Sequence, residues 1–176
     1  MPRSFVSGII LCSFLCFNCE KNGGGSESEN NEPVEGQDWD LVWSDEFDGG
    51  SLDQSKWNIL RWRPGWVNNE LQAYTARDTN IYLENGNLVL RALIEPGYFD
   101  SDYQGNSYNA DYTSGRINTA EKFGPTYGRL DIRAKLPKGR GSWPAIWMLG
   151  ESISTIGWPN CGEIDIMEHV GFDNGI

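Results

Sequence analysis

The chain has 176 residues, 39% of them hydrophobic, and carries a formal net charge of -11 at pH 7. This length builds one domain of ordinary size, or part of a larger one, around its own core. The acidic balance excludes a nucleic-acid-binding protein, because no basic stripe is present to neutralise phosphates, whereas an uncharged ligand is compatible with such a surface.

Residues 1–19 have the features of an export signal. Arg3 provides a short positive start, and residues 5–17 are largely apolar but too few to span a bilayer. Cys19 is followed at once by a polar, Gly-rich stretch, which resembles a bacterial lipoprotein signal whose cysteine becomes lipidated. Asn18 replaces the usual small residue before that cysteine, so Cys16 is an alternative acceptor, and plain secretion also stays open.

Residues 20–37 are Gly-rich and then rich in Ser, Glu and Asn. They contain too few apolar groups to offset the entropy of ordering, which predicts a hydrated, flexible linker. We therefore expect an exported protein of a Gram-negative bacterium. It is lipid-anchored at the outer membrane or cell surface, or else secreted, and it contacts a membrane only through the anchor.

The globular part, residues 38–176, shows strand patterns in its first half. A strand is expected over 39–47, followed by a turn over 51–57 that places Trp57 in the core. Residues 62–75 are rich in aromatics and amides without a clear period, so a functional loop and a strand are both compatible. Alternation on both sides of Asn85-Gly86 predicts a type I′ hairpin over 81–94, and residues 96–113 are expected to form a polar surface loop.

Further strands are expected over 114–119, 127–136 and 143–149. In the last of these, period two places Trp143, Ala145 and Trp147 on one face, and Pro144 cannot donate to a ladder, so the strand should begin or bulge there. We expect no helix. Strands at short spacing with Gly and Pro turns predict an all-β sandwich or jelly roll.

Three carboxylates, Glu163, Asp165 and Glu168, stand among aliphatic residues near the end of the chain. In a regular strand Glu163 and Asp165 share one face, but Glu168 falls on the other, beside buried aliphatics. Burying an unpaired carboxylate is costly, so we predict a one-residue β-bulge near residues 166–167, which brings all three acids onto one face.

Such a face would suit the hydrolysis of a sugar chain. The apolar faces of pyranose rings stack on indoles such as Trp143 and Trp147. Cleavage needs one carboxyl group that protonates the leaving oxygen and one ionised carboxylate, while Asp165 would hold a proton on a neighbour by like-charge repulsion. A solvated acidic strand, a Ca²⁺ or Mg²⁺ site built from the three acids, and a core role for the two Trp residues remain alternatives.

The motifs carried by these residues resemble glycoside hydrolase family 16, and within it the bacterial laminarinase-type endo-1,3-β-glucanases. They are, in chain order, Trp43-Ser-Asp-Glu-Phe-Asp-Gly49, Asn68-Asn-Glu-Leu-Gln-x-Tyr74-Thr75, Ser114-Gly-Arg-Ile117, Trp143-Pro-Ala-Ile-Trp-Met-Leu149 and Trp158-Pro-x-x-Gly-Glu-Ile-Asp-Ile-Met-Glu168. The resemblance covers residues 39–176. It implies a β-jelly-roll sandwich of two antiparallel sheets with a concave substrate cleft, and retaining endo-hydrolysis of β-1,3-glucans.

The resemblance also implies roles for single residues. Glu163 matches the nucleophile, Glu168 the general acid/base and Asp165 the assisting carboxylate. Trp143, Trp147, Arg116 and Asn69 match residues that contact the sugar. No cofactor takes part in catalysis, but the family often carries a structural Ca²⁺ on its convex side, where Glu46 and the carbonyl of Gly86 lie in matching regions.

Family domains run well beyond the length available here, so we expect a domain that is incomplete at its C-terminus and unstable as it stands. The expected partner is a β-glucan, and the expected state is a monomer. Two other interpretations stay open. One is a related galactan hydrolase of the agarase, porphyranase or carrageenase type, and the other is a non-catalytic glucan-binding module of the same fold.

Overall fold

Strands make up nearly all the regular structure in the part of the chain that the computed structural model describes, which is residues 39–171 and the backbone of residues 9–15. The elements are β1 (Ile9–Leu15), β2 (Trp43–Asp45), β3 (Asn58–Ile59), β4 (Gln72–Tyr74), β5 (Ile81–Leu83), β6 (Leu88–Leu90), β7 (Leu93–Ser101), β8 (Ser107–Ser114), β9 (Ile117–Asn118), β10 (Arg129–Ala134), β11 (Ala145–Leu149), α1 (Ile153–Ile156) and β12 (Glu163–Glu168). No helix within these residues is long and apolar enough to cross a membrane. The predicted all-β class is confirmed.

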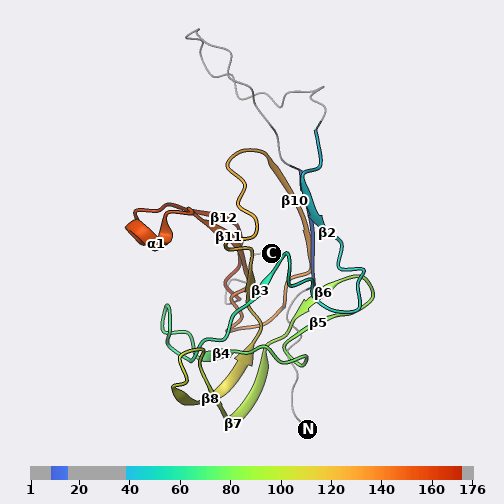
Figure 1. The fold of residues 1–176 in the computed structure, drawn as a ribbon. Helices are drawn as coiled ribbons and strands as arrows, with labels where there is room; N and C mark the ends of the chain where they lie inside the picture. Colours follow the sequence, from blue (N-terminus) through green and yellow to red (C-terminus); the bar gives the residue numbers. More distant parts are fainter. Residues whose placement is uncertain (1–8, 16–38, 172–176) are drawn as a thin grey trace.

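The strands form four groups (Figure 1). The largest sheet has the order β10-β1-β6-β5, with β2 also paired to β1. A second sheet has the order β4-β8-β7, and the pairs β3-β9 and β11-β12 complete the set. The described pairs are antiparallel except for β4 and β8, which run parallel, a departure from the purely antiparallel sheets that the resemblance implies.

The main core lies against the largest sheet. Phe47, Trp57, Ile81 and Leu88 are buried together, and Ile132 of β10 packs against them. The turn over 51–57 places Trp57 in this core as predicted. Burying an indole requires a partner for its N–H, and Trp57 Nε1 donates to Oδ2 of buried Asp45 at 2.8 Å.

The hairpin predicted around Asn85-Gly86 is confirmed. Asn85 has a φ of 52° and Gly86 a φ of 68°, as a type I′ turn requires at its two central positions. The strands β5 and β6 pair from Ile81 with Leu90 to Leu83 with Leu88.

The prediction of a surface loop over 96–113 is wrong, because β7 and β8 form a long antiparallel hairpin there. The many polar side chains of this segment favoured a loop over strands in the sequence analysis. One side of β8 is nevertheless apolar, because Tyr108 and Ala110 pack with buried Ala73 of β4. A register shift between Ile94 and Tyr98 absorbs the Pro-Gly step at 96–97, since Pro and Gly are tolerated in strands where the ladder is irregular.

A polar network anchors this hairpin to the rest of the molecule. Arg77 donates to Glu95 of β7 and to Thr113 of β8, and fully buried Asn80 donates to Thr113 Oγ1 at 3.0 Å. Thr113 in turn donates to Glu95. Buried polar groups are costly unless they are hydrogen-bonded, and these groups supply one another's partners.

Two smaller expectations need correction. The prediction that no helix occurs misses α1, a single turn inside the loop between β11 and β12. The strand expected over 114–119 is divided, since Ser114 ends β8 and only Ile117–Asn118 form β9.

The N-terminal predictions fall mostly outside the described residues. In the structure Ile9–Leu15, part of the predicted signal segment 1–19, pairs as β1 with β10, β2 and β6. The linker over 20–37 and the lipidation site Cys19 lie outside the described residues.

Candidate active site

The three acids come together through the pairing of β11 with β12. Across this pair Leu149 lies opposite Glu163, Trp147 opposite Asp165 and Ala145 opposite Glu168. Directly opposed residues of an antiparallel pair project to the same face, and so do alternate residues of a regular strand such as β11. Glu163, Asp165 and Glu168 therefore share one face.

That shared face depends on a β-bulge. Ile146 pairs with Met167, and the next residue, Trp147, pairs with Asp165, so Ile166 is an extra residue without an opposite partner. The bulge predicted near residues 166–167 is present. Without it Glu168 would project from the opposite side of the strand.

Two indoles donate hydrogen bonds to the two glutamates at the ends of this row. Trp143 Nε1 lies 2.9 Å from Glu168 Oε1, and Trp158 Nε1 lies 2.5 Å from Glu163 Oε2. Both indoles remain at least half exposed, at 50% and 65%. The position of Trp143 beside the acids follows the sequence prediction. Trp158 is included in the sequence analysis only as part of a motif and is given no role there. The feature that could have revealed its role is its position five residues before Glu163.

Asp165 is electrostatically distinct within the row. Desolvation first, and then the neighbouring charges of Glu163 and Glu168, raise the pKa of Asp165 above its usual value. The charged form of this central carboxyl group is therefore disfavoured, as expected for like charges crowded on one strand.

Arg116 connects the acid-bearing strands to the segment before β4. Its guanidinium lies over the rings of Trp62, Tyr74 and Trp147, at 4.3, 5.4 and 5.1 Å from their centroids. Such cation–π contacts hold a planar cation in a fixed position. The sequence named Arg116 and Trp147 separately; the structure places them in contact and adds Trp62, which was not predicted.

Gly115 allows Arg116 to take this position. A Cβ atom at residue 115 would lie 2.6 Å from Ile81 Cγ1 and 2.7 Å from the carbonyl oxygen of Asn80. Glycine is therefore required for the close approach of this segment to β5.

Asn69 lies in the turn before β4, exposed and with a φ of 53°. Among the described residues, no hydrogen bond joins its side chain to the three acids. Its neighbour Glu70 accepts hydrogen bonds from Tyr74 Oη at 2.7 Å and from Gln72 Nε2 at 3.0 Å. Burial, followed by this bond to Glu70, raises the pKa of Tyr74 to about 12. The Tyr74 hydroxyl therefore keeps its proton, and its hydrogen bond to Glu70 holds the turn in place.

The structural calcium site stays a prediction. Glu46 is exposed beside β2, and Gly86 is exposed in the β5–β6 turn. Within residues 39–171 no group of three or more Asp, Glu, His or Cys side chains is assembled that could hold a metal ion. Side chains of the described part therefore do not by themselves form a complete donor set of the kind that Ca²⁺ prefers.

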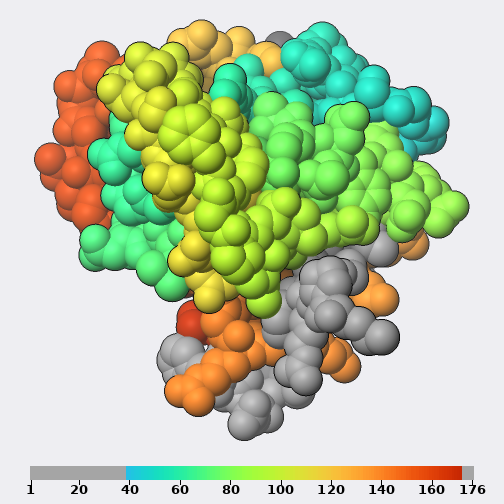
Figure 2. Space-filling view, turned by 90° about the horizontal axis from the view of Figure 1, so that it is seen from below, coloured from blue at the N-terminus to red at the C-terminus, as the bar shows by residue number. Residues whose placement is uncertain are grey.

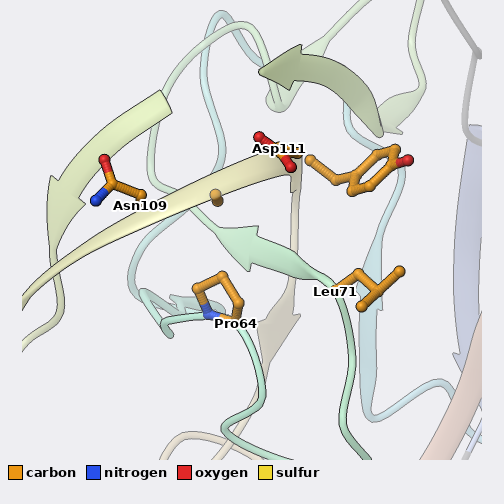
Figure 3. A pocket seen from close by; sticks show the side chains of 6 residues that line it. Pro64, Leu71, Asn109 and Asp111 are labelled. Atoms are coloured by element: carbon orange, nitrogen blue, oxygen red, sulfur yellow. The ribbon is translucent and has the colours of Figure 1, made fainter. Parts of the chain in front are cut away.

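Two open grooves flank the segment before β4. One, of about 300 Å³, is lined by Ile59, Leu60, Arg61, Trp62 and Tyr103. The other, of about 330 Å³, is lined by Pro64, Leu71 and residues 109–112 of β8; in Figure 3, Pro64 and Leu71 lie across from Asn109 and Asp111. The first groove contains Trp62, one of the rings that contact Arg116.

An all-β chain that lines one sheet face with carboxylates and exposed indoles has the site of a glycoside hydrolase. A family described as an XgeA-like, catalytic GH16 domain matches residues 65–174. The chain belongs to glycoside hydrolase family 16, and its fold is the jelly-roll sandwich of that family.

The relatives agree with this family. A beta-glucanase from Rhodothermus marinus is 45% identical over 172 residues, which cover 96% of this chain and 52% of the relative. The crystal structure of the laminarinase catalytic domain from Thermotoga maritima is similar with a TM-score of 0.66 and 50% identity, over 78% of this chain and 54% of that one.

A third relative has a different named activity. A keratan-sulfate endo-1,4-beta-galactosidase from Sphingobacterium multivorum is 35% identical over 185 residues, which cover 94% of this chain and 40% of the relative. The chain spans about half the length of the Rhodothermus and Thermotoga relatives.

Proposed function

We propose that the protein hydrolyses internal bonds of β-1,3-linked glucans of the laminarin type, with retention of anomeric configuration. The observation that carries this proposal is the bulge at Ile166, which places Glu163 and Glu168 on one face of β12. Retaining hydrolysis needs a nucleophile and a general acid that flank the bond to be cut, and two acids on one strand face can both reach a sugar chain that lies across it. The names of the Rhodothermus and Thermotoga relatives support a β-glucan as the substrate.

In the first step Glu163 acts as the nucleophile. Its carboxylate attacks the anomeric carbon while Glu168 transfers its proton to the glycosidic oxygen, so one C–O bond forms as another breaks. In the second step Glu168, now ionised, takes a proton from water, and the resulting hydroxide equivalent displaces Glu163. Two inversions at the same carbon leave the product with the starting configuration.

The residues around the acids have supporting roles. Trp158 donates to the ionised carboxylate of Glu163 and holds it in position. Asp165, whose pKa is raised above its usual value, is the carboxyl neighbour between the two glutamates. Trp143 and Trp147 offer indoles on which sugar rings stack, and Arg116 provides N–H groups for sugar hydroxyls. Asn69 is proposed as a more distant sugar contact.

Glu163→Gln tests this function. Glutamine keeps the shape but cannot form the glycosyl ester, so release of reducing ends from laminarin should fall by at least about 10³-fold while the melting temperature stays unchanged. Glu151→Gln, an exposed glutamate in the loop after β11, is the matched control and should retain full activity. Normal turnover by Glu163→Gln would refute the assignment of the nucleophile.

A galactan is the second candidate substrate, favoured by the similarity to the Sphingobacterium galactosidase. The net charge of -11 disfavours a sulfated chain, because like charges on enzyme and substrate oppose binding. Reducing-end assays on laminarin, lichenan, agarose and carrageenan, performed in parallel with one preparation, distinguish the two substrates. A glucan-binding module without activity would release sugar from none of them.

We also propose that the protein is exported and lipid-anchored through Cys19. The apolar stretch before Cys19 and the polar stretch after it support this proposal. Replacing Cys19 by Ala should move the protein from the membrane fraction to the soluble fraction of the native host. Unchanged membrane association would contradict Cys19 as the anchor and point to Cys16.

A further inference from the structure

The tip of the β7–β8 hairpin holds an exposed aromatic side chain in a fixed loop. Tyr103 is 59% exposed. Its neighbour Asp102 is only 3% exposed and accepts hydrogen bonds from the backbone N–H groups of Gln104 and Asn106, both at 2.9 Å. Burial opposes ionisation of Asp102, but the bonds from Asn106 and Gln104 outweigh it and lower its pKa. The loop is therefore pinned around a buried carboxylate.

The base of the same loop is tied to the segment before β4. Arg61 Nη2 donates to the backbone carbonyl of Ser101 at 2.9 Å and to Asp100 at 3.2 Å, and Tyr98 Oη donates to Asp100 at 2.7 Å. Figure 2 shows the yellow-green surface of the hairpin beside the teal-green surface of the segment around residues 60–70. The position of Tyr103 is thus set before any ligand arrives.

A series of contacts through one guanidinium and two indoles leads from Trp147 of β11 to Tyr103. The Arg116 guanidinium lies over both Trp147, opposite Asp165, and Trp62. Trp62 lies 6.1 Å from Trp66, which in turn meets the edge of Tyr103 at 5.7 Å. Trp62 and Tyr103 also line the groove of about 300 Å³. Aromatic side chains that line a groove provide stacking surfaces for the apolar faces of sugar rings.

We propose that Tyr103 forms a distal glucose-binding subsite with Trp62, which makes the enzyme prefer long glucan chains over short ones. This inference rests on the proposed function and adds to it a specificity-determining residue at the far end of the cleft. A tyrosine this exposed contributes little to the core. A pinned loop is what a pre-organised contact requires, because a mobile aromatic would lose conformational entropy on binding.

The test compares the binding of laminaribiose with that of laminarihexaose to the full chain carrying Glu163→Gln, measured by titration calorimetry. Adding Tyr103→Ala should weaken hexaose binding by about tenfold relative to biose binding, which is the factor expected for one lost stacking contact. Tyr103→Phe should restore the long-chain preference, because the ring rather than the hydroxyl makes the contact. Tyr127→Ala, equally aromatic and 77% exposed but in neither groove, is the control and should change neither affinity.

Equal losses for both sugars in the Tyr103→Ala variant would show that Tyr103 only supports the fold, and no loss for either would show that it does not contact the chain. Both outcomes overturn the subsite. A larger effect of Tyr112→Ala, which alters the second groove, would overturn it as well. None of these outcomes bears on the proposed function, which is tested separately by the loss of hydrolysis in Glu163→Gln.

Discussion

The acids of the β7–β8 hairpin and the acids of β12 respond to the fold in opposite ways. The pKa values of Glu95, Asp100 and Asp102 are lowered by hydrogen bonds and nearby cations that outweigh the effect of burial, whereas that of Asp165 is raised. The hairpin carboxylates are surrounded by donors, and Asp165 is surrounded by other carboxylates. The first arrangement stabilises the fold, while the second disfavours the charged form of Asp165.

The number of donors accounts for this difference. Glu95 accepts from two guanidinium nitrogens of Arg77 and from Thr113. On β12 the donors found among the described residues are single indole N–H groups, one for Glu163 and one for Glu168. Carboxylates with few donors stay free to bind a sugar or to transfer a proton, and their immediate surroundings contribute less to stability.

The largest effect on stability is expected for Glu95→Gln. A neutral amide keeps the volume but loses the charge-assisted bonds to Arg77, so the free energy of unfolding should fall by about 2 kcal/mol, as measured in urea. The exposed Glu84→Gln in the β5–β6 hairpin is the matched control and should change it little.

The pH dependence of Glu95→Gln sharpens the same prediction. The folded-state pKa of Glu95 lies below its model value of 4.5, so its stabilisation is fully present above that pH and is lost as the pH falls through the folded-state value. The deficit of the variant should therefore shrink in acid. A deficit that is constant from pH 3 to pH 7 would mean that packing, not charge, is responsible.

An intermediate effect, on activity alone, is expected for Trp158→Phe. Without the indole N–H, the carboxylate of Glu163 loses the donor that holds it in position, so kcat/KM on laminarin should fall by about five- to tenfold while the melting temperature stays unchanged. A melting temperature that falls together with kcat/KM would show that Trp158 acts by packing.

The smallest effect, and one of opposite sign to that of Glu95→Gln, is expected for Asp165→Asn. A raised folded-state pKa means that Asp165 supports the fold below the unfolded value of about 3.8 and loses this contribution as the pH rises through its folded-state value. Differential scanning calorimetry should therefore show a slightly higher melting temperature for the variant at pH 7 and no difference at pH 3. A lower melting temperature at pH 7 would contradict the like-charge account.

Local patterns predicted the parts of the fold that local chemistry determines. Asn85-Gly86 predicted its hairpin because two consecutive residues with positive φ leave few alternatives. The bulge on β12 followed from the cost of leaving Glu168 among aliphatics, and the structure has it at Ile166. Both inferences depended only on residues within one strand or turn.

The parts that were missed depend on contacts between distant segments. The β7–β8 hairpin is polar along much of its length, and its pairing is favoured by contacts with Ala73 and Arg77, some 20 to 40 residues earlier in the chain. The three aromatic rings around Arg116 come from three separate segments. No window of the sequence contains these neighbours together, so periodicity could not reveal them.

The extra residue at Ile166 makes the catalytic arrangement depend on strand register as well as on sequence. If the ladder between β11 and β12 were regular at the same chain length, Glu168 would turn to the opposite face, and the chain would retain its surface for sugars but lose its proton donor. Deleting Ile166 would instead leave Glu163, Asp165 and Glu168 at alternating positions, so a regular ladder would keep all three acids on one face. The spacing of the acids can therefore shorten by one residue without loss of hydrolysis, whereas a one-residue slip in register abolishes it.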